Sequence, residues 1–387
     1  MTLTIPADNL WAFAAVWLAL ATIAAFLARR LGLAAALVEI LLGVLAGNLI
    51  GLRSNAWVDF VAGFASIMLT FLAGAEIEPA VLRRQLRPSA VIGGISFFAP
   101  FLAAMAYAYF VMHWSVDASK IAGIAMSTTS VAVVYAVMVE SRLAGTDFGQ
   151  LILAACFITD LGTVVALGLL FANYNGWLVA LIVAIVLAIV FVPKLLPLVF
   201  ERTQRWVSEP GMRLLFLIIL TLSAIATAAK SEGVLPAYFL GLACAGFLFA
   251  NPDVSRRLRS MTMGFLTPFY FIKAGTLVSF SAAVAGVGVI AAFFVVKVVA
   301  KCLGVFPAAR VFDHAPKRAG YITLMMATGL TFGTISSLYG LTHHYINQAQ
   351  YTTLVTVVIL TAVVPTIVAQ ALFHPKELVD PEERGVP

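Results

Sequence analysis

The chain has 387 residues, of which 62% are hydrophobic and only 11% are charged, and its formal net charge is +6. A water-soluble domain would carry about 25% charged residues and about half apolar ones, so this composition excludes a soluble globule and indicates a protein embedded in a lipid bilayer. The basic residues lie in connections between apolar stretches, which favours membrane topology over nucleic-acid binding as the reason for the positive charge.

Apolar stretches of about 20 residues recur along the whole chain, and each can cross roughly 30 Å of hydrocarbon as a helix. The short segments of alternating apolar and polar residues that form transmembrane barrels do not occur. We therefore predict an all-α polytopic membrane protein with about thirteen transmembrane helices. The predicted spans are Leu10–Leu27, Leu33–Ile50, Trp57–Ala75, Ala90–Val111, Ile121–Val139, Leu151–Phe171, Trp177–Phe200, Met212–Ala229, Val234–Phe249, Met261–Ser279, Ala283–Phe306, Ala319–Gly340 and Thr352–Phe373.

The first three spans contain few charged residues. The residues before the first span include Asp8 but no basic residue. A secretory signal peptide begins with a positively charged region, so we expect the first span to be retained. Glu39 in the second span and Glu76 at the end of the third lie close to membrane interfaces or to small residues. We expect structural or vestibule roles for both, with Glu76 as an auxiliary residue of an ion site.

The fifth and twelfth spans are interrupted in corresponding positions, by Ser127–Ser130 and by Ala327–Thr331. Unwound backbone at mid-membrane depth is tolerated where it lines a water-filled site, so the pattern predicts two broken helices around a cation site. Thr129 and Ser130 are candidate ligands there, with Thr331 as an auxiliary residue. The alternative is that these hydroxyls bond back to their own helices, but the matched positions argue against it. Spans one to six and eight to thirteen would then form two inverted six-helix repeats.

Asp160 stands near the middle of the sixth span, directly after Thr159, with no basic neighbour in its segment. A charge at the bilayer centre costs about 2.5–3.5 kcal/mol on insertion scales, which favours a functional role over structural polar packing. Because burial disfavours the charged form of a carboxylate, a proton and a small cation can compete for one such site. We predict that Asp160, with Thr159, binds Na⁺ and protons in turn.

Three lysines also fall within predicted spans. Lys297 and Lys301 are four residues apart in the eleventh span and therefore lie on one face of a helix. We predict that one or both face Asp160, where they compensate charge or carry a proton; the alternative for Lys301 is an ammonium that extends to the membrane surface. For Lys273 in the tenth span, a structural partner role and an auxiliary role in transport both stay open.

Enzymatic motifs do not occur. The chain lacks a phosphate-binding Walker loop, a zinc-protease His-Glu-x-x-His pattern and a Gly-x-Ser-x-Gly elbow. Cys156, Cys244 and Cys302 lie in apolar runs without the spacing of a metal site or disulfide pair, which favours packing roles. We therefore predict a secondary transporter and not an enzyme, with no cofactor other than the transported cation and proton.

The distribution of lysine and arginine predicts the topology. Basic residues gather in alternate connections, whereas the other side of the membrane holds only Arg53, Lys120 and Lys230. Because cytoplasmic loops carry the positive excess, we expect the N-terminus outside and the C-terminus in the cytoplasm of a bacterial inner membrane. About fourteen residues follow the last span, so no soluble regulatory domain is expected.

Taken together, these segments resemble the monovalent cation:proton antiporter-2 family, the Nap-type and Kef-type bacterial exchangers, over nearly the whole chain. Asp160 falls on the ion-binding aspartate of that family and Lys301 on its lysine. The other similar segments are Val38–Gly47, Phe71–Glu76, Thr129–Val131, Thr267–Phe271 and Lys301–Gly304.

The resemblance implies a homodimer with elevator-type alternating access, driven by a proton gradient without ATP. Residues 1–77 and 212–280 would form the dimer scaffold, residues 90–171 and 283–373 the moving core, and residues 177–200 a linker helix. The sequence departs from the family at Thr159, where relatives carry an acidic residue or an amide. Lys301 then pairs with Asp160 directly or is held otherwise, and the charge stoichiometry is left open.

A second departure lies in the twelfth span, where Gly329-Leu330-Thr331 replaces an Arg-Gly-Glu run of many relatives. Lys273, a basic residue where some relatives have a neutral one, could replace part of that charge.

We predict a Na⁺(Li⁺)/H⁺ antiporter in contact with membrane lipid. The alternatives are a K⁺/H⁺ antiporter, a sodium-coupled organic anion symporter of similar fold and a non-transporting membrane receptor.

Overall fold

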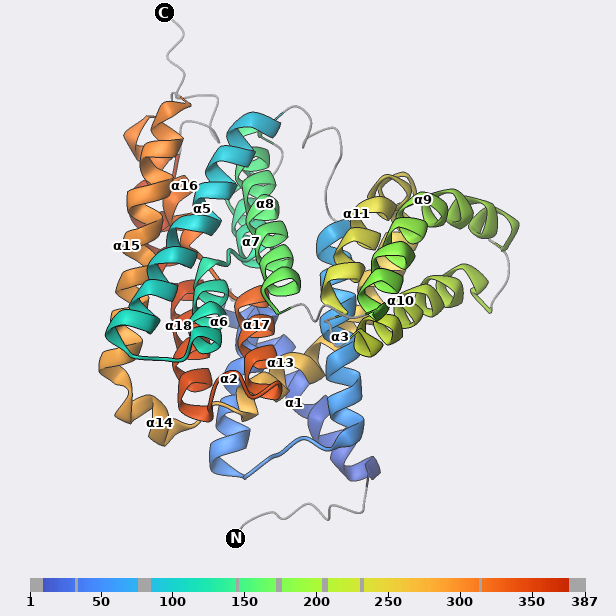
Figure 1. The fold of residues 1–387 in the computed structure, drawn as a ribbon, viewed down its shortest axis with the longest axis horizontal. Helices are drawn as coiled ribbons and strands as arrows, with labels where there is room; N and C mark the ends of the chain where they lie inside the picture. Colours follow the sequence, from blue (N-terminus) through green and yellow to red (C-terminus); the bar gives the residue numbers. More distant parts are fainter. Residues whose placement is uncertain are drawn as a thin grey trace, which may run out of the picture. The chain divides into compact units, whose positions relative to one another are not determined.

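A computed structural model describes residues 10–31, 34–75, 85–143, 146–171, 176–203, 208–229, 233–312 and 315–375 (Figure 1). Two predictions fall outside these ranges: the auxiliary role of Glu76 and the position of Lys230. All regular elements of the described residues are helical, as the sequence predicts.

The described helices follow the predicted spans closely. In the first half of the chain they are α1 (Leu10–Leu31), α2 (Ala35–Leu49), α3 (Ala56–Ala75), α5 (Leu86–Ala106) with the π-helical turn η1 (Tyr107–Val111), α6 (Val116–Ser127), α7 (Val131–Glu140) and α8 (Asp147–Leu170). In the second half they are α9 (Gly176–Thr203), α10 (Pro210–Ala228), α11 (Val234–Ala250), α12 (Pro252–Met261), η2 (Thr262–Leu266), α13 (Thr267–Thr276), α14 (Phe280–Ala285), α15 (Val287–Val311), α16 (Pro316–Ala327), α17 (Thr331–Thr342), α18 (Gln348–Val368) and η3 (Ala369–Phe373).

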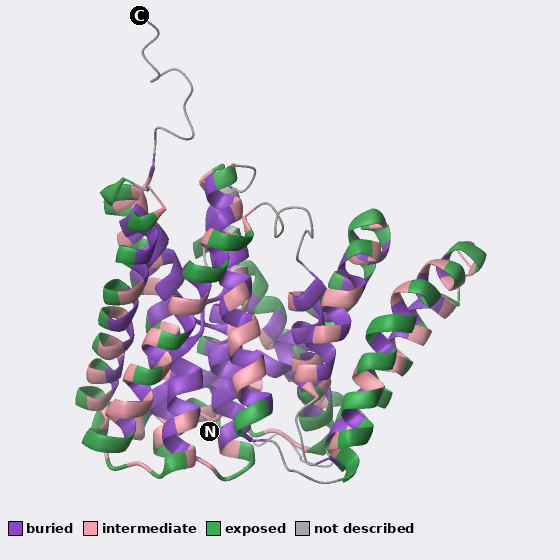
Figure 2. Ribbon diagram, turned by 45° about the horizontal axis from the view of Figure 1, so that its top comes forward, coloured by how far each residue is buried: buried purple, intermediate pink, exposed green. Residues whose placement is uncertain are grey.

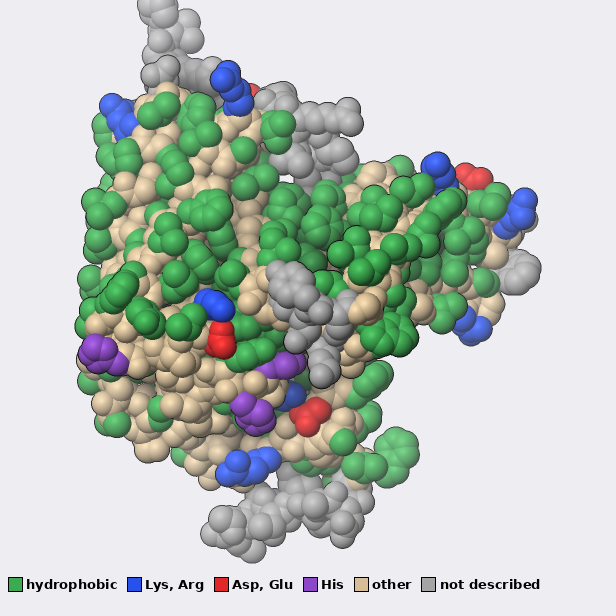
Figure 3. Space-filling view, viewed as in Figure 1, with side chains coloured by type: hydrophobic (Ala, Val, Ile, Leu, Met, Phe, Trp, Pro, Cys, Tyr) green, Lys and Arg blue, Asp and Glu red, His purple; other side chains and the backbone are tan. Residues whose placement is uncertain are grey.

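Nine helical stretches of the described residues are long and apolar enough to cross a membrane, and α2 and α11 are shorter apolar helices. Charged side chains are sparse among hydrophobic ones on the surface shown in Figure 3, as expected of helices that face lipid. The all-α polytopic fold is thus confirmed, while the number of thirteen spans stays a prediction.

The tenth span differs from its predicted limits. Helical structure begins at Pro252 rather than at Met261, because α12 precedes η2 and α13 without a break. The segment of α12 contains Arg256, Arg257 and Arg259 and buries only Val254 and Leu258. An apolar-run criterion cannot detect such a polar, amphipathic helix.

Contacts divide the chain into two compact units. Unit 1 comprises Met1–Asn55, Gln85–Thr163 and Phe271–Pro387, and unit 2 comprises Ala56–Arg84 and Val164–Tyr270. The division into scaffold and core expected from the family resemblance stays a prediction.

In unit 1, α5 and α15 pack along each other, and α16, α18 and α6 pack around them. The core between them joins Ile92 of α5, Val134 of α7, Ile152 of α8, Val305 of α15 and Met325 of α16. In Figure 2, where the ribbon is purple at buried residues, long parts of the packed helices are purple. The stretch from Pro316 to Thr342 is the most buried of the candidate spans, at 89%, so the second interrupted span is enclosed by protein.

In unit 2, α3 packs closely against α11, and α9 and α10 lie beside α11. The close approach requires glycine, because a Cβ at Gly241 would lie 2.0 Å from the Phe71 carbonyl oxygen and one at Gly74 would lie 2.3 Å from that of Tyr238. Small residues at such contacts are typical of helices packed within membranes. By contrast, only 17% of α9 is buried, so most of its apolar surface is available to lipid.

Candidate functional site

Both predicted interruptions are real breaks, and the first residue of each has the same backbone conformation. Helix α6 ends at Ser127 and α7 begins at Val131, whereas α16 ends at Ala327 and α17 begins at Thr331. The first residue of each break is extended, with φ −62° and ψ 149° at Thr128 and φ −63° and ψ 145° at Thr328. This match supports the predicted repeat between the two halves.

The two breaks are joined by hydrogen bonds. The Thr129 hydroxyl donates to the Met326 carbonyl oxygen at 2.9 Å, and the Ser130 backbone N–H lies 3.5 Å from the Thr328 hydroxyl oxygen. Thr128 and Thr328 instead donate to carbonyl oxygens of their own helices, at 3.0 and 2.8 Å, as the alternative interpretation of these hydroxyls expects. Only some of these hydroxyls therefore form hydrogen bonds between the two breaks.

Lys301 lies against the first break. Its ammonium donates to the Ser96 hydroxyl at 2.7 Å, to the Ser127 carbonyl oxygen at 2.9 Å and to the Thr129 hydroxyl at 3.2 Å. The side chain is fully buried, so the predicted alternative of an ammonium extended to the surface is wrong. An ammonium has three donors, and all three are engaged by neutral oxygens, so none of these hydrogen bonds depends on an acidic residue at position 159.

Lys297 lies one turn away on α15 and is also fully buried. Its ammonium donates to the Thr361 hydroxyl of α18 at 3.2 Å. It also approaches the second break, since a Cβ added at Gly329 would lie only 2.3 Å from Lys297 Nζ. The two lysines therefore reach different breaks although they share one face of α15.

Asp160 lies near the middle of α8 and is 2% exposed. It is close enough to Lys301 for the two charges to interact electrostatically. The preceding Thr159 hydroxyl lies 3.1 Å from the Gly93 carbonyl oxygen and 3.0 Å from that of Ala155, so it ties α8 to α5. The structure thus places the buried Asp160 near Lys301, whose ammonium also contacts Thr129.

Other predicted site residues lie around this region or apart from it. Ser130 is buried in the first break and its hydroxyl oxygen accepts from the Val133 N–H at 3.4 Å. Thr331 is half-buried as the first residue of α17, and Lys273 is half-buried on α13. Glu39, expected near an interface or small residues, is 4% exposed on α2.

Sequence reasoning did not single out Ser96 or Thr361, which hold the two ammonium groups. Both are ordinary hydroxyl residues within apolar spans, and neither lies near a charged residue in the sequence. Hydroxyls of this kind commonly bond to their own helix, so no local signal distinguishes these two. Their role depends on which helix faces α15.

Residues 18–374 match the family described as "Sodium/hydrogen exchanger, transmembrane". The chain belongs to this family. The resemblance to cation/proton antiporters is thus confirmed for the family as a whole, and the subfamily stays a proposal.

Three relatives of this sodium/hydrogen exchanger family member are informative. It is 22% identical over 352 residues to "Probable Na(+)/H(+) antiporter 3" of Methanocaldococcus jannaschii, covering 86% of this chain and 90% of the relative. It is 22% identical over 362 residues to "Na(+)/H(+) antiporter" of Enterococcus hirae, covering 90% and 94%. It is 24% identical over 269 residues to "Putative Na(+)/H(+) antiporter YjbQ" of Bacillus subtilis, where the match covers 64% of this chain and only 44% of the relative.

A solved structure shares the fold of this exchanger-family chain. The sodium proton antiporter MjNhaP1 from M. jannaschii at pH 8 superposes with a TM-score of 0.70, covering 94% of this chain and 98% of that one at 17% identity. At this identity the likeness establishes the fold, and the site has to be argued from the residues of this chain.

Proposed function

We propose that this chain is a secondary-active antiporter that exchanges Na⁺ or Li⁺ for protons. The observation that carries the proposal is the buried Asp160 near Lys301, whose three hydrogen bonds go to neutral oxygens on α5 and at the first helix break. The names of the relatives support antiport, and they do not favour the potassium, symport or receptor alternatives.

In this proposal Asp160 binds a cation and a proton alternately, with Thr159, Thr129 and Ser130 as neighbouring oxygen donors. A carboxylate and hydroxyl oxygens are hard ligands that suit a small monovalent cation. A bound cation or proton neutralises the carboxylate, which lowers the cost of carrying it through the membrane interior. When neither ion is bound, the charged carboxylate makes movement of the site across the membrane unfavourable. The cation flux and the proton flux are therefore coupled without ATP.

The finer predictions belong to the same proposal. We place the chain among the Nap-type and Kef-type antiporters, as a homodimer in a bacterial inner membrane with its C-terminus in the cytoplasm. Residues 1–77 and 212–280 would form the scaffold and residues 90–171 and 283–373 the core that moves as an elevator, with 177–200 as the linker. The matched breaks in α6–α7 and α16–α17 support an inverted repeat, on which such movement depends.

The test is cation-induced recovery of a pH-gradient dye in proteoliposomes, with Na⁺, Li⁺ and K⁺ titrated separately. Wild type is expected to collapse the gradient with Na⁺ or Li⁺, and Asp160→Asn is expected to lose this activity because it removes the group that cation and proton share. Asp117→Asn, at a half-buried position on α6 paired with Lys120, is the control and should behave as wild type. Collapse by no monovalent cation, or undiminished activity of Asp160→Asn, would contradict the proposal.

A further inference from the structure

The two buried lysines of α15 have different surroundings. Lys301 donates to three neutral oxygens on α5 and at the first break. Lys297 reaches Thr361 on α18 and the second break at Gly329. One helix therefore presents an ammonium to each break, one turn apart.

The contact at Gly329 is close. A Cβ added there would lie 2.3 Å from Lys297 Nζ, 3.0 Å from the Thr128 hydroxyl oxygen and 3.3 Å from the Thr128 carbonyl oxygen. The ammonium, the backbone of the second break and Thr128 of the first break consequently meet at one point. Any side chain at position 329 would displace the ammonium from it.

A positive charge next to the second break can stabilise the C-terminal end of a helix. The last carbonyl groups of a helix lack partners within the helix and carry partial negative charge. Helix α16 ends at Ala327, inside the most buried span, where the Met325 and Met326 carbonyl oxygens accept hydrogen bonds from the Thr328 and Thr129 hydroxyls and a nearby ammonium adds positive charge. Lys301 meets the corresponding need at the first break, where it donates to the Ser127 carbonyl oxygen at the end of α6.

We propose that Lys297, oriented by the Thr361 hydroxyl, is the positioning residue of the second break, as Lys301 is of the first. Lys297 holds the backbone at Gly329 in place without binding the transported cation, and Thr361 acts through it. The inference rests on the antiport function proposed above for its effect on transport, whereas the contact itself does not depend on that function.

A double-mutant cycle tests the role in exchange. Lys297→Met keeps the length of the side chain and removes the charge, and Thr361→Val keeps the shape and removes the hydroxyl. Because a hydrogen bond to a charged group is worth about 1.5–3 kcal/mol, each change is expected to lower the maximal exchange rate about tenfold or more. Thr361→Val is expected to have no further effect in the Lys297→Met background; an equal loss in both backgrounds would show packing alone and overturn the proposal.

Conservative variants give matched controls. Thr361→Ser retains the hydroxyl and Lys297→Arg retains the charge, so both are expected to keep more activity than their neutral counterparts. Gly329→Ala leaves Lys297 in the chain but displaces its ammonium, and should also lower exchange. Gly94→Ala on α5, where an added Cβ would meet no atom within 4 Å, should have no effect. Equal activity of Gly329→Ala and Gly94→Ala would contradict the assigned contact.

Thermal unfolding of the same four proteins of the cycle separates this inference from the proposed function. The unfolding midpoints in detergent are expected to be non-additive, because Thr361 contributes through Lys297. Additive midpoints would overturn the contact even if exchange is intact. If wild type exchanges no cation while the midpoints are non-additive, the antiport function fails and the positioning of the break by Lys297 stands.

Discussion

At the scale of single residues, the structure shows how the buried Lys301 side chain is hydrogen-bonded although position 159 carries a threonine and not an acidic residue. Ser96 accepts one of three hydrogen bonds from Lys301. Ser96→Ala is expected to lower the maximal exchange rate about tenfold, since a bond to a charged group contributes about 1.5–3 kcal/mol. Dye-based exchange in proteoliposomes measures this loss. Ser89→Ala, on the same helix with a hydroxyl that bonds back to Gln85, is the control, and an equal effect of both substitutions would contradict the role of Ser96.

At the scale of secondary-structure elements, the two breaks depend on each other through Thr129. Its hydroxyl donates to Met326 at the end of α16 and accepts from Lys301 of α15. Thr129→Val keeps the shape of the side chain and removes both bonds, so we expect exchange to fall more than about tenfold. Thr323→Val on α16 loses only a bond to the carbonyl oxygen of Ala319 in its own helix and should retain nearly wild-type rates. Similar rates for the two variants would show that the link between the breaks does not matter for transport.

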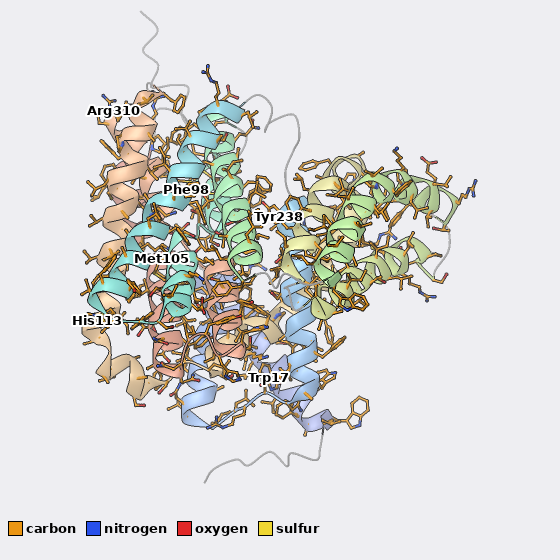
Figure 4. The ribbon with its side chains drawn as sticks, in the orientation of Figure 1. Trp17, Phe98, Met105, His113, Tyr238 and Arg310 are labelled. Carbon is orange, nitrogen blue, oxygen red and sulfur yellow. The ribbon has the colours of Figure 1, made fainter. Side chains whose placement is uncertain are left out.

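At the scale of the whole molecule, the proposed topology places two exposed positions of unit 1, at His113 and Arg310, on opposite sides of the membrane. His113 follows η1 and Arg310 lies in the last turn of α15, and both are exposed (Figure 4). In a background without Cys156, Cys244 and Cys302, His113→Cys should react with an impermeant maleimide in right-side-out membranes, because it lies outside. Arg310→Cys should react only in inverted vesicles. Labelling of both from one side, or the opposite pattern, would refute the orientation.

Composition and local pattern were sufficient for the membrane class, the helical architecture and both helix breaks. Run length and hydroxyl–glycine interruptions are properties of neighbouring residues, so they can be seen without tertiary structure. Sequence spacing also placed Lys297 and Lys301 on one face of a helix. The hydrogen-bond partners of the two lysine ammonium groups could not be predicted in this way. Ser96 and Thr361 lie 205 and 64 residues from the lysines that they hold, and only the packing of α5 and α18 around α15 brings them into reach. Burial makes those partners necessary, because an ammonium away from water must find its oxygen acceptors within the protein.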